Sequence, residues 1–422
     1  MNRPRNGNAY YEGPPKQPHH PAASGEVDAG SHDERTPLGP LADASPTNRS
    51  VGVYVHVPFC TRRCEYCSFN TAPMEDRAGV ARFVDAVRRE IGIVAGAPWA
   101  GDVRVGSVFF GGGTPSLLEA SELAAILAAL RDGFALDGDA EITVECNPES
   151  VSRAKLVGYR DAGVSRISLG VQSLDDAMLA AIGRLHTAAA ARAAFDVART
   201  AGFDNVSVDL IYGLPDLTAE TWRSTVDGVV AWRPEHLSAY GLTVDPGSVW
   251  GSTGVAGLPA EDTVVAHYWT MVERAAAGGY EHYEISNYAR DGRRSRHNQV
   301  YWRRGEYLAF GPGAAGFVGD LRYTNVKPVG RYAQRVADGD LPLDTWERLQ
   351  ARQALAETLI LGLRTADGVA TSVLAERVAG DAALTRRVAA WREQSLLVDV
   401  GSRTRLSDAG FLLSDALFMD LL

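Results

Sequence analysis

The pattern that most constrains the fold of this chain is a regular alternation of strand-like and helix-like segments between residues 51 and 243. Short runs rich in β-branched and aromatic residues predict buried strands, and the Ala/Leu-rich stretches between them predict helices. Strands that alternate with helices pair in parallel through right-handed crossovers. Six such repeats predict an α/β fold built on a partial (β/α)6 barrel, with a doubly wound open sheet as the alternative. The expected strands are 51–57, 105–110, 141–145, 166–171, 205–211 and 236–243, and the expected helices are 77–94, 121–130, 188–201 and 219–230.

Three further segments lie outside this barrel region, which we assign to residues 49–250. Residues 1–48 are rich in Pro, Gly and small polar residues without periodicity, which predicts a disordered N-terminal extension. Residues 251–345 are rich in Gly, Pro and aromatic residues around a helical pattern at 260–277, and we expect them to close the open side of the barrel. Residues 346–422 predict short helices around two strand-like runs, which is typical of a small winged-helix-like domain. A chain of 422 residues is long enough for two folded units.

Composition and charge exclude several classes of protein. The content of 45% hydrophobic and 22% charged residues is ordinary for a globular protein, and no apolar run is long enough to span a bilayer. The first residues lack the apolar core of a secretory signal, so we expect a cytoplasmic protein, with peripheral membrane association left open. A net charge of −10 without a basic stripe disfavours nucleic acid as a partner. The C-terminal unit is therefore expected to serve packing or to act as a lid.

Three of the four cysteines, Cys60, Cys64 and Cys67, lie within eight residues of one another. This spacing predicts a metal or cluster loop rather than a disulfide framework. Structural zinc needs four ligands, and His56 on the preceding strand is the available fourth one. A [4Fe-4S] cluster on three cysteines instead leaves one iron open for a small-molecule chelate. Cys146 stands apart behind a strand pattern, which is typical of a buried inert thiol.

Glycines and polar residues occur where the expected strands end, which is where a parallel barrel carries its functional groups. A run of three glycines at 111–113 follows the second strand, and glycines let a backbone approach a ligand closely. Glu145 ends the third strand, Gln172 ends the fourth and Asp209 lies on the fifth. Such side chains can hold an amino group or ribose hydroxyls, and Arg184 can pair with a carboxylate. Taken singly, each is equally typical of a capping, loop or surface residue.

The spacing Cys-x3-Cys-x2-Cys resembles the signature of the radical-SAM superfamily. In that superfamily three cysteines hold a [4Fe-4S] cluster, and the fourth iron takes the amino and carboxylate groups of S-adenosylmethionine (SAM). The resemblance implies that Cys60, Cys64 and Cys67 bind such a cluster, that SAM is a second cofactor, and that the partial barrel is of the radical-SAM type.

Further motifs are similar to the oxygen-independent coproporphyrinogen III oxidase family over about residues 51–316. They are Tyr-x-His-x-Pro-Phe-Cys at 54–60, the glycine run, Gly-Val-Gln-Ser at 170–173 and Asp-Leu-Ile-Tyr-Gly-Leu-Pro at 209–215. The resemblance assigns the SAM contacts to Tyr54, Gly112, Gly113, Thr114, Glu145, Gln172, Arg184 and Asp209.

The resemblance also bears on which branch of this family the chain is most similar to. True oxidases resemble one another in a further cysteine two residues after the third cluster cysteine, and this chain has Phe69 at that position. They also resemble one another in an N-terminal segment that reaches the active site, and residues 1–48 show no pattern of such an ordered segment. These departures favour the haem-chaperone branch. The stretch at 297–302 is similar to the haem motif of that branch and implies haem binding by His297, Asn298, Tyr301 and Trp302. An imidazole is a good axial ligand for haem iron, although on the residues alone such a histidine is more often a hydrogen-bonded packing residue.

Three functions remain open on the sequence. The first is a haem chaperone that binds the cluster, SAM and haem, and that transfers haem to acceptor proteins. The second is a radical-SAM coproporphyrinogen oxidase of porphyrin biosynthesis. The third is a zinc-stabilised barrel without redox chemistry. The sequence assigns no catalytic residue and no second axial haem ligand. Ala315 stands where relatives commonly carry a histidine, so any role of that histidine is absent from this chain.

Overall fold

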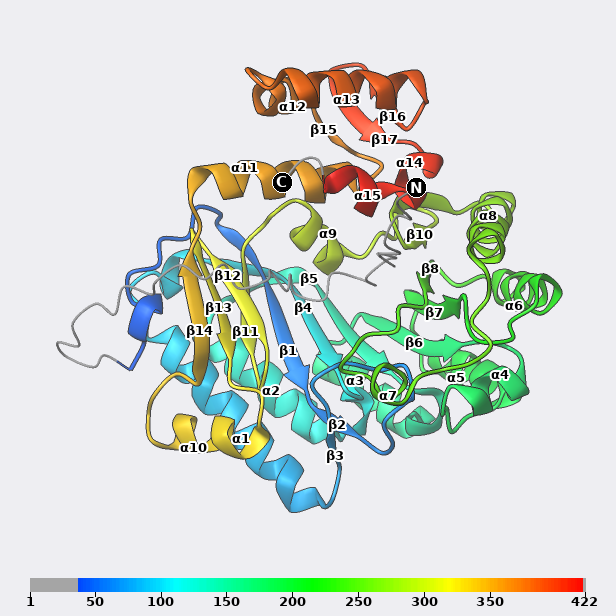
Figure 1. Ribbon diagram of the computed structural model, residues 1–422. Coiled ribbons are helices and arrows are strands. Elements are labelled where there is room, and N and C mark those ends of the chain that lie inside the picture. Colours follow the sequence, from blue (N-terminus) through cyan, green and yellow to red (C-terminus); the bar gives the residue numbers. More distant parts are fainter. Residues whose placement is uncertain (1–36, 420–422) are drawn as a thin grey trace.

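The computed structural model describes residues 37–419, and a twelve-stranded sheet forms the centre of the molecule (Figure 1). All six predicted strands are present, and they pair in parallel in the same order as in the chain. Because the strand order never reverses, the core has the topology of a partial barrel and not of a doubly wound sheet. The α/β class with a parallel core is therefore confirmed. The strands are β1 (Ser50–Val57), β4 (Arg104–Gly112), β5 (Ala135–Cys146), β6 (Arg166–Gln172), β7 (Val206–Tyr212) and β8 (His236–Gly241).

The crossover helices pack side by side along one face of the sheet. Several begin at a residue whose side chain accepts a hydrogen bond from a free N–H of the first turn, as Asp76, Ser152, Thr187 and Thr218 do. The helices are α1 (Arg77–Ala95), α2 (Ala120–Gly133), α3 (Arg153–Ala162), α4 (Asp176–Ala181), α5 (Ala188–Thr200) and α6 (Ala219–Ala231), with the short 3-10 turns η1 (Gly39–Leu41), η2 (Ala100–Asp102), η3 (Pro115–Leu117) and η4 (Pro148–Ser150).

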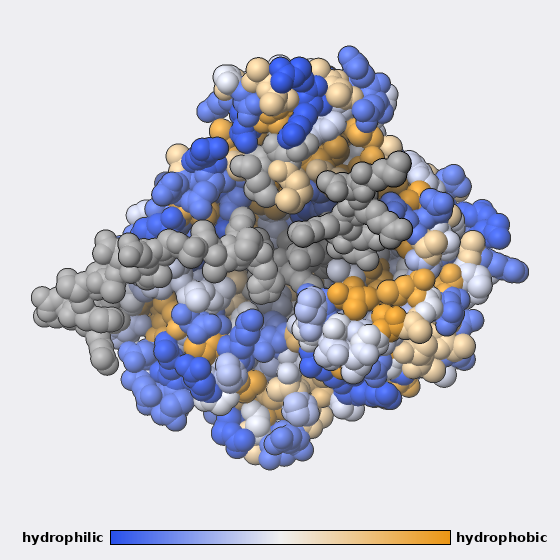
Figure 2. Space-filling view, viewed as in Figure 1, coloured by the Kyte–Doolittle hydropathy of each residue, from blue (hydrophilic) through white to orange (hydrophobic). Residues whose placement is uncertain are grey.

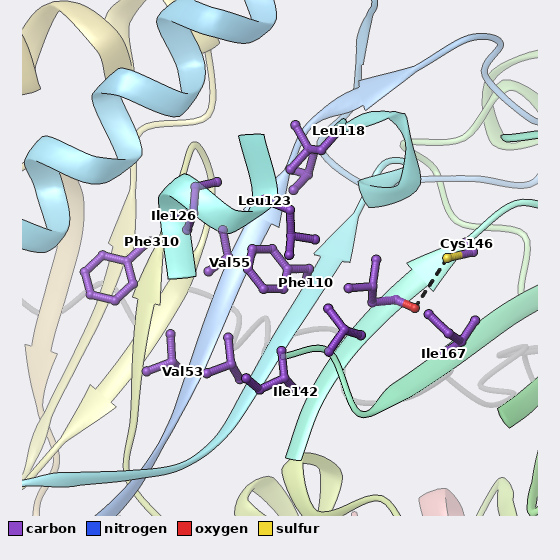
Figure 3. Packing of buried hydrophobic residues seen from close by; sticks show 14 of the residues in the cluster. Val53, Val55, Phe110, Leu118, Leu123, Ile126, Ile142, Cys146, Ile167 and Phe310 are labelled. Carbon is purple, nitrogen blue, oxygen red and sulfur yellow. Dashed lines mark hydrogen bonds between the residues drawn. The ribbon is translucent and has the colours of Figure 1, made fainter. Parts of the chain in front are cut away.

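The two faces of the sheet carry different kinds of side chain, because successive residues of a strand point to opposite faces. Val53 and Val55 of β1 pack with Phe110 and Leu123 on the face covered by helices (Figure 3). The other face lines the barrel interior and carries a row of buried polar groups in register with one another. Both faces are buried but only the helix-covered face is apolar, so apolar and polar residues alternate along β6, β7 and β8. The interior polar residues include Ser107, Glu141, Thr143, Arg166, Ser168, Ser207, His236 and Ser238.

Residues 251–345 add strands to both edges of the parallel core instead of joining the edges by hydrogen bonds. Strands β10 and β9 extend the sheet beyond β8, and β11 to β14 extend it beyond β1. The chain crosses from β10 at one edge to β11 at the other, and β9 and β14 are the two outermost strands. The elements are α7 (Val249–Thr253), α8 (Glu261–Ala277), β9 (Glu281–Glu284), β10 (Asn287–Ala289), α9 (Arg296–Trp302), β11 (Tyr307–Phe310), β12 (Ala315–Val318), β13 (Leu321–Asn325), α10 (Val329–Ala337) and β14 (Leu343–Arg348).

Part of the segment assigned to the N-terminal extension packs against the folded core. Leu41 is fully buried, and its carbonyl oxygen accepts a 2.7 Å hydrogen bond from the Trp99 indole. The backbone N–H groups of Thr47 and Asn48 donate to the buried carboxylate of Glu306. The predicted boundary at residue 48 is therefore too late in the chain, because residues 37–48 form such contacts. Residues 1–36 lie outside the described part.

The C-terminal segment forms a small unit with its own hydrophobic core and a three-stranded sheet of order β15-β17-β16. Ile285 and Trp302 of the barrel contribute to that core, so the unit packs directly against α9. Its outermost visible residues are largely hydrophilic (Figure 2). None of the described helices is long and apolar enough to cross a membrane. The elements are α11 (Ala351–Leu363), β15 (Val369–Ala370), α12 (Thr371–Val378), α13 (Ala382–Glu393), β16 (Leu397–Val400), β17 (Arg403–Leu406), α14 (Asp408–Leu412) and α15 (Ser414–Phe418).

A buried carboxylate joins α1 to the loop that follows β11. Glu90 accepts hydrogen bonds from the Gly311 N–H (2.9 Å), the Asn325 amide (2.6 Å) and the Tyr332 hydroxyl (2.5 Å). Burial raises the pKa of Glu90 to about 7, although these donors act in the opposite direction. The folded protein therefore binds this proton more tightly than the unfolded chain does. The resulting stabilisation is complete below the ordinary pKa of 4.5 and is lost as the pH rises through about 7.

We expect Glu90→Gln to reduce the loss of stability on going from about pH 5 to about pH 8, because an amide does not ionise and keeps much of the hydrogen bonding. The measurement is Tm as a function of pH for the variant and the wild type. Glu75→Gln, at an exposed position, is the matched control and should follow the wild-type profile. A Glu90→Gln profile parallel to that of the wild type would show that this carboxyl does not titrate in the range.

Candidate functional site

The three clustered cysteines lie on a loop at the C-terminal end of β1. The loop is shaped by the two-stranded ribbon of β2 (Phe59–Cys60) and β3 (Ala72–Pro73) and by a hydrogen bond from the Cys67 N–H to the Cys64 carbonyl oxygen. The Arg63 guanidinium donates to the Gly247 carbonyl oxygen at 2.6 Å, which fastens the loop to the segment before α7. All three cysteines are half-buried, so their thiols remain reachable from the barrel mouth.

Two donors face the sulfur atoms of this loop. The Thr114 hydroxyl lies 3.6 Å from Cys60 Sγ, and the Arg184 guanidinium lies 3.7 Å from Cys64 Sγ. Burial, together with the neighbouring sulfurs of Cys64 and Cys60, raises the pKa of Cys67 to about 11. Without a bound metal the Cys67 thiol therefore keeps its proton at neutral pH. A metal centre replaces such protons, and charge-assisted donors then stabilise the thiolates.

This donor set fits an iron–sulfur cluster better than a single zinc ion. Among the described residues, no three His, Cys, Asp or Glu side chains are gathered closely enough to hold one metal ion. A [4Fe-4S] cluster takes each thiolate on a different iron, so it needs sulfurs that stand further apart. His56, the proposed fourth zinc ligand, is buried, and its Nε2 donates to the Asn70 carbonyl oxygen at 2.8 Å while its Nδ1 accepts from the Tyr54 hydroxyl at 3.0 Å. Both ring nitrogens are therefore engaged.

The glycine run at the end of β4 is required by packing against the cysteine loop. A Cβ atom on Gly113 would stand 2.6 Å from the Phe59 carbonyl oxygen, and one on Gly112 would stand 2.6 Å from the His56 ring. Gly112 also has φ of +113°, which favours glycine. Its N–H donates to Glu145 at 3.2 Å. These glycines bring β4 and the cysteine loop together, which differs from the sequence argument that they expose backbone to a ligand.

Two acidic side chains meet in the interior although they lie 64 residues apart in the chain (145 and 209). Burial, together with the nearby charge of Asp209, raises the pKa of Glu145 to about 8. The hydroxyls of Ser168 and Ser207 donate to the Asp209 carboxylate at 3.0 to 3.3 Å. Burial also raises the pKa of Asp209. A cationic ligand between these groups would compensate their charge, and its binding would release protons.

The remaining predicted polar residues converge around Arg184. Its guanidinium donates to the Asn147 amide oxygen and to the Gly170 carbonyl oxygen, both at 2.7 Å. The Asn147 amide donates in turn to Thr114 at 3.2 Å. Buried Gln172 Oε1 and Arg184 Nε have no hydrogen-bond partner among the described residues. Such unpartnered polar atoms are costly, so they point to a polar ligand at this place.

The sequence analysis missed two interior residues of this region. Asn147 links Arg184 to Thr114, and the available signal was its position two residues after Glu145 at the same strand end. Arg166 begins β6, and its buried guanidinium acts electrostatically on Glu141, Glu145 and Asp209. The sequence predicts only that Arg166 begins a strand, because nothing in the neighbouring residues indicates that an arginine at this position is buried.

The motif at 297–302 forms α9, which lies at the opposite end of the strands from the cysteine loop (Figure 1). His297 is fully buried beside Gly52 of β1 and stacks on Phe109 with ring centroids 5.2 Å apart. Its Nδ1 lies 2.9 Å from the Ser107 hydroxyl, and its Nε2 lies 2.8 Å from the Tyr301 hydroxyl. Gly52 and the last residue of β1 are five residues apart in the strand (52 and 57), or about 17 Å.

This geometry does not support the predicted axial role of His297. One ring nitrogen must donate and the other must accept, so no lone pair is free for haem iron in this arrangement. Burial, together with the Arg166 guanidinium, lowers the pKa of His297 to about 3, which keeps the ring neutral. Tyr301 is committed to His297 and to Tyr307, with which it forms an edge contact at 4.6 Å. The structure thus places these two residues in the packing at the base of the barrel.

The other two residues of the predicted haem motif face elsewhere. Trp302 packs into the core of the C-terminal unit and is only 3% exposed, and its indole Nε1 has no partner among the described residues. Asn298 is half-buried, and its backbone N–H donates to the Ser295 hydroxyl that caps α9. The four residues of the motif therefore do not converge on one site.

Comparisons with known proteins identify the family of this chain. Residues 54–228 match the family model described as the radical SAM superfamily. The chain is 39% identical over 378 residues to the heme chaperone HemW of Mycobacterium tuberculosis (strain CDC 1551 / Oshkosh), which covers 88% of this chain and 94% of the relative. It is 33% identical to the heme chaperone HemW of Bacillus subtilis (strain 168), covering 77% of this chain and 86% of that relative.

A solved structure supports the fold. Coproporphyrinogen III oxidase (HemN) from Escherichia coli superimposes with a TM-score of 0.79 over 90% of this chain and 92% of that chain, at 23% sequence identity. That similarity shows a shared fold and no more. The sequence identity to the Mycobacterium tuberculosis chaperone extends over 88% of this chain and 94% of that relative. The chain therefore belongs to the HemW-type family of radical-SAM proteins.

Proposed function

We propose that this protein is a haem chaperone that binds haem and transfers it to acceptor proteins, with a [4Fe-4S] cluster and SAM at the mouth of its barrel. The observation that carries the proposal is the 39% identity to a heme chaperone across 88% of the chain. The fold alone would equally suit a coproporphyrinogen oxidase, because the solved oxidase covers 90% of this chain. Phe69, which stands where the oxidases resemble one another in a cysteine, favours the chaperone.

Each part of the proposed cofactor site has a residue suited to it. Cys60, Cys64 and Cys67 would bind three irons, while Thr114 and Arg184 donate toward two of the sulfurs. The carboxylates of Glu145 and Asp209 suit the positively charged amino group and sulfonium of SAM. The buried atoms of Gln172 and Arg184 that lack hydrogen-bond partners suit the polar groups of SAM. The other predicted SAM contacts are Tyr54, Gly112 and Gly113. When bound, the cluster and SAM supply one-electron chemistry.

We expect Glu145→Ala and Asp209→Ala each to weaken SAM binding by about 1–3 kcal/mol, because each removes a buried partner of a cationic ligand. Equilibrium dialysis under anaerobic conditions measures the affinity, and iron and sulfide analysis should show an unchanged cluster. Asp196→Ala, which removes an exposed carboxylate on α5, is the matched control. Wild-type affinity in both interior variants would remove the two carboxylates from the SAM site.

One anaerobic assay separates the proposed function from the oxidase. Protein with a reconstituted cluster, SAM and reductant is expected to bind haem and pass it to an apo-haemoprotein, followed by the Soret band of the acceptor. It should leave the propionates of coproporphyrinogen III intact. Serum albumin, a non-specific haem binder, is the control for passive release. Decarboxylation of coproporphyrinogen III without haem transfer would establish the oxidase instead.

The cytoplasm is the compartment we propose for this activity, with haem-acceptor proteins as the partners. The likeness to heme chaperones supports the proposed partners, and no helix among residues 37–419 is long and apolar enough to cross a membrane. Fractionation with an antibody against the protein tests it. Recovery of the protein in the membrane fraction at high salt would contradict this assignment.

A further inference from the structure

A pocket of about 510 Å³ is lined by residues of α9 and of the C-terminal unit, including α11. These elements lie at the end of the molecule remote from the cysteine loop (Figure 1). This volume lies within the range of small-molecule sites in proteins. Gln299 and Trp302 of α9 form one wall, and Val369 and Val373 of the C-terminal unit form another. Gly362 of α11 lies between them. The pocket thus joins the motif at 297–302 to the C-terminal unit, and none of its lining residues belongs to the cluster site.

The charge around this pocket is opposite in sign to that of the whole chain. Arg294, Arg303 and Arg403 line it together with a single acidic residue, Asp367, in a protein of net charge −10. Asp367 is shared between Arg294, at 2.9 Å, and Arg303, at 3.5 Å. Arg294 also pairs with Glu281 beside the pocket. Three guanidiniums therefore face two carboxylates, which leaves an excess of positive charge.

The uncompensated charge belongs to Arg403 on β17. Its Nε donates to the Asp367 carbonyl oxygen and its Nη2 donates to the Gly368 carbonyl oxygen, both at 2.6 Å. Within residues 37–419 it forms no ion pair with a carboxylate. A guanidinium has five N–H donors in a planar fork, so two bonds to backbone leave donors for a carboxylate ligand. The two contacts with backbone carbonyl oxygens fix the orientation of the Arg403 guanidinium at the pocket.

Trp302 gives the pocket a second unused donor, although its ring is buried in the core of the C-terminal unit. Its indole Nε1 is buried without a partner among the described residues, which costs free energy unless a ligand or water satisfies it. No His, Cys or Met lines the pocket. The Tyr283 hydroxyl, which also lies there, is hydrogen-bonded to His236 at 2.8 Å. The lining therefore offers aromatic and cationic contacts but no free ligand for a metal.

We propose that this pocket binds the carboxylate-bearing edge of a porphyrin, with Arg403 and Arg303 on the carboxylates and the half-buried Ala370 and Val373 against the macrocycle. The inference rests on the proposed haem-chaperone function and names the part of the molecule that carries the cargo. A flat apolar ring with carboxylates at one edge matches an apolar wall bordered by guanidiniums. Because the lining holds no free metal ligand, recognition comes from the ring and its carboxylates rather than from iron.

The test is a titration of the full chain, with its cluster reconstituted, followed by quenching of tryptophan fluorescence. The probes are haem, iron-free protoporphyrin IX and the dimethyl ester of protoporphyrin IX. We expect haem and protoporphyrin IX to bind with affinities within about threefold of each other and the ester to bind at least about tenfold more weakly. Arg403→Gln should weaken the binding of haem and of protoporphyrin IX by about tenfold and leave the affinity for the ester unchanged.

Three further variants guard against an indirect effect of Arg403→Gln on the turn that it holds. Arg403→Lys keeps the charge and should retain most of the affinity, while Arg303→Gln, at a side chain 66% exposed, should lose affinity without loss of fold. Arg386→Gln removes the same charge from an exposed position on α13 and should bind as the wild type does. Haem binding that requires iron, or that is unchanged in both Arg403→Gln and Arg303→Gln, would overturn the site but not the function. Absence of binding by every probe would overturn both.

Discussion

Replacing Cys60, Cys64 and Cys67 together by alanine is expected to abolish the broad visible absorption near about 400 nm that Cys-ligated iron–sulfur centres show. The reason is geometric, because these three sulfurs are the thiols that the loop after β1 brings to the barrel mouth. The loop itself should persist, since backbone bonds and the ribbon of β2 and β3 shape it. Iron and sulfide analysis after anaerobic reconstitution gives the measurement.

Cys146→Ala is the matched control, because Cys146 differs from the other three in its surroundings. It is 3% exposed, and its thiol donates to the Val144 carbonyl oxygen within the hydrophobic core (Figure 3). Burial raises the pKa of Cys146 to about 12, so it remains a neutral thiol. This variant should keep full iron and sulfide content. Normal reconstitution of the triple variant would show that other residues hold the cluster.

His297→Ala is expected to lower the free energy of unfolding by about 3 kcal/mol, because it creates a cavity and leaves two buried hydroxyls without their partner. Those hydroxyls are Ser107 and Tyr301, each within 2.9 Å of the imidazole. Denaturant unfolding of the cluster-free protein measures the change. If the structure holds in the haem complex, the variant should show a Soret band at the wild-type position.

Tyr301→Phe separates the hydrogen bond from the packing of the ring. It removes only the hydroxyl that His297 contacts and should cost about 1 kcal/mol. Both variants must carry a filled cluster site during haem titration, because free thiolates ligate haem themselves. A stable His297→Ala protein with a shifted Soret band would restore His297 as an iron ligand and require α9 to rearrange when haem binds.

The position of the motif at 297–302 bears on how cofactor and cargo are separated. The cysteine loop lies beyond the end of β1, whereas His297 lies beside Gly52 near its start, about 17 Å away along the strand. The proposed porphyrin pocket is lined by Gln299 and Trp302 of the same helix, α9. Cluster and cargo would thus occupy opposite ends of the barrel, an arrangement in which SAM acts on haem only indirectly.

The order of strands and helices and the place of the cysteine loop were determined by the sequence itself. Hydrophobic periodicity is local, and capping residues such as Asp76 and Thr218 mark helix starts within a few positions. The alternation of strand and helix then restricts topology, because parallel strands need crossovers of one hand. The spacing of Cys60, Cys64 and Cys67 places three thiols on one loop without reference to the rest of the fold.

Only the tertiary structure decided which distant groups meet. The charge of Asp209 acts on Glu145 because β5, β6 and β7 pair in a register that aligns their inner rows. The motif at 297–302 predicts that His297 ligates haem iron. The Ser107 hydroxyl, from a distant part of the sequence, instead hydrogen-bonds to His297 Nδ1 and makes this histidine a packing residue. The pocket at Arg403 exists only because the C-terminal unit packs on α9. Sequence patterns report the preferences of neighbouring residues, whereas burial and pairing depend on contacts between segments that no local pattern encodes.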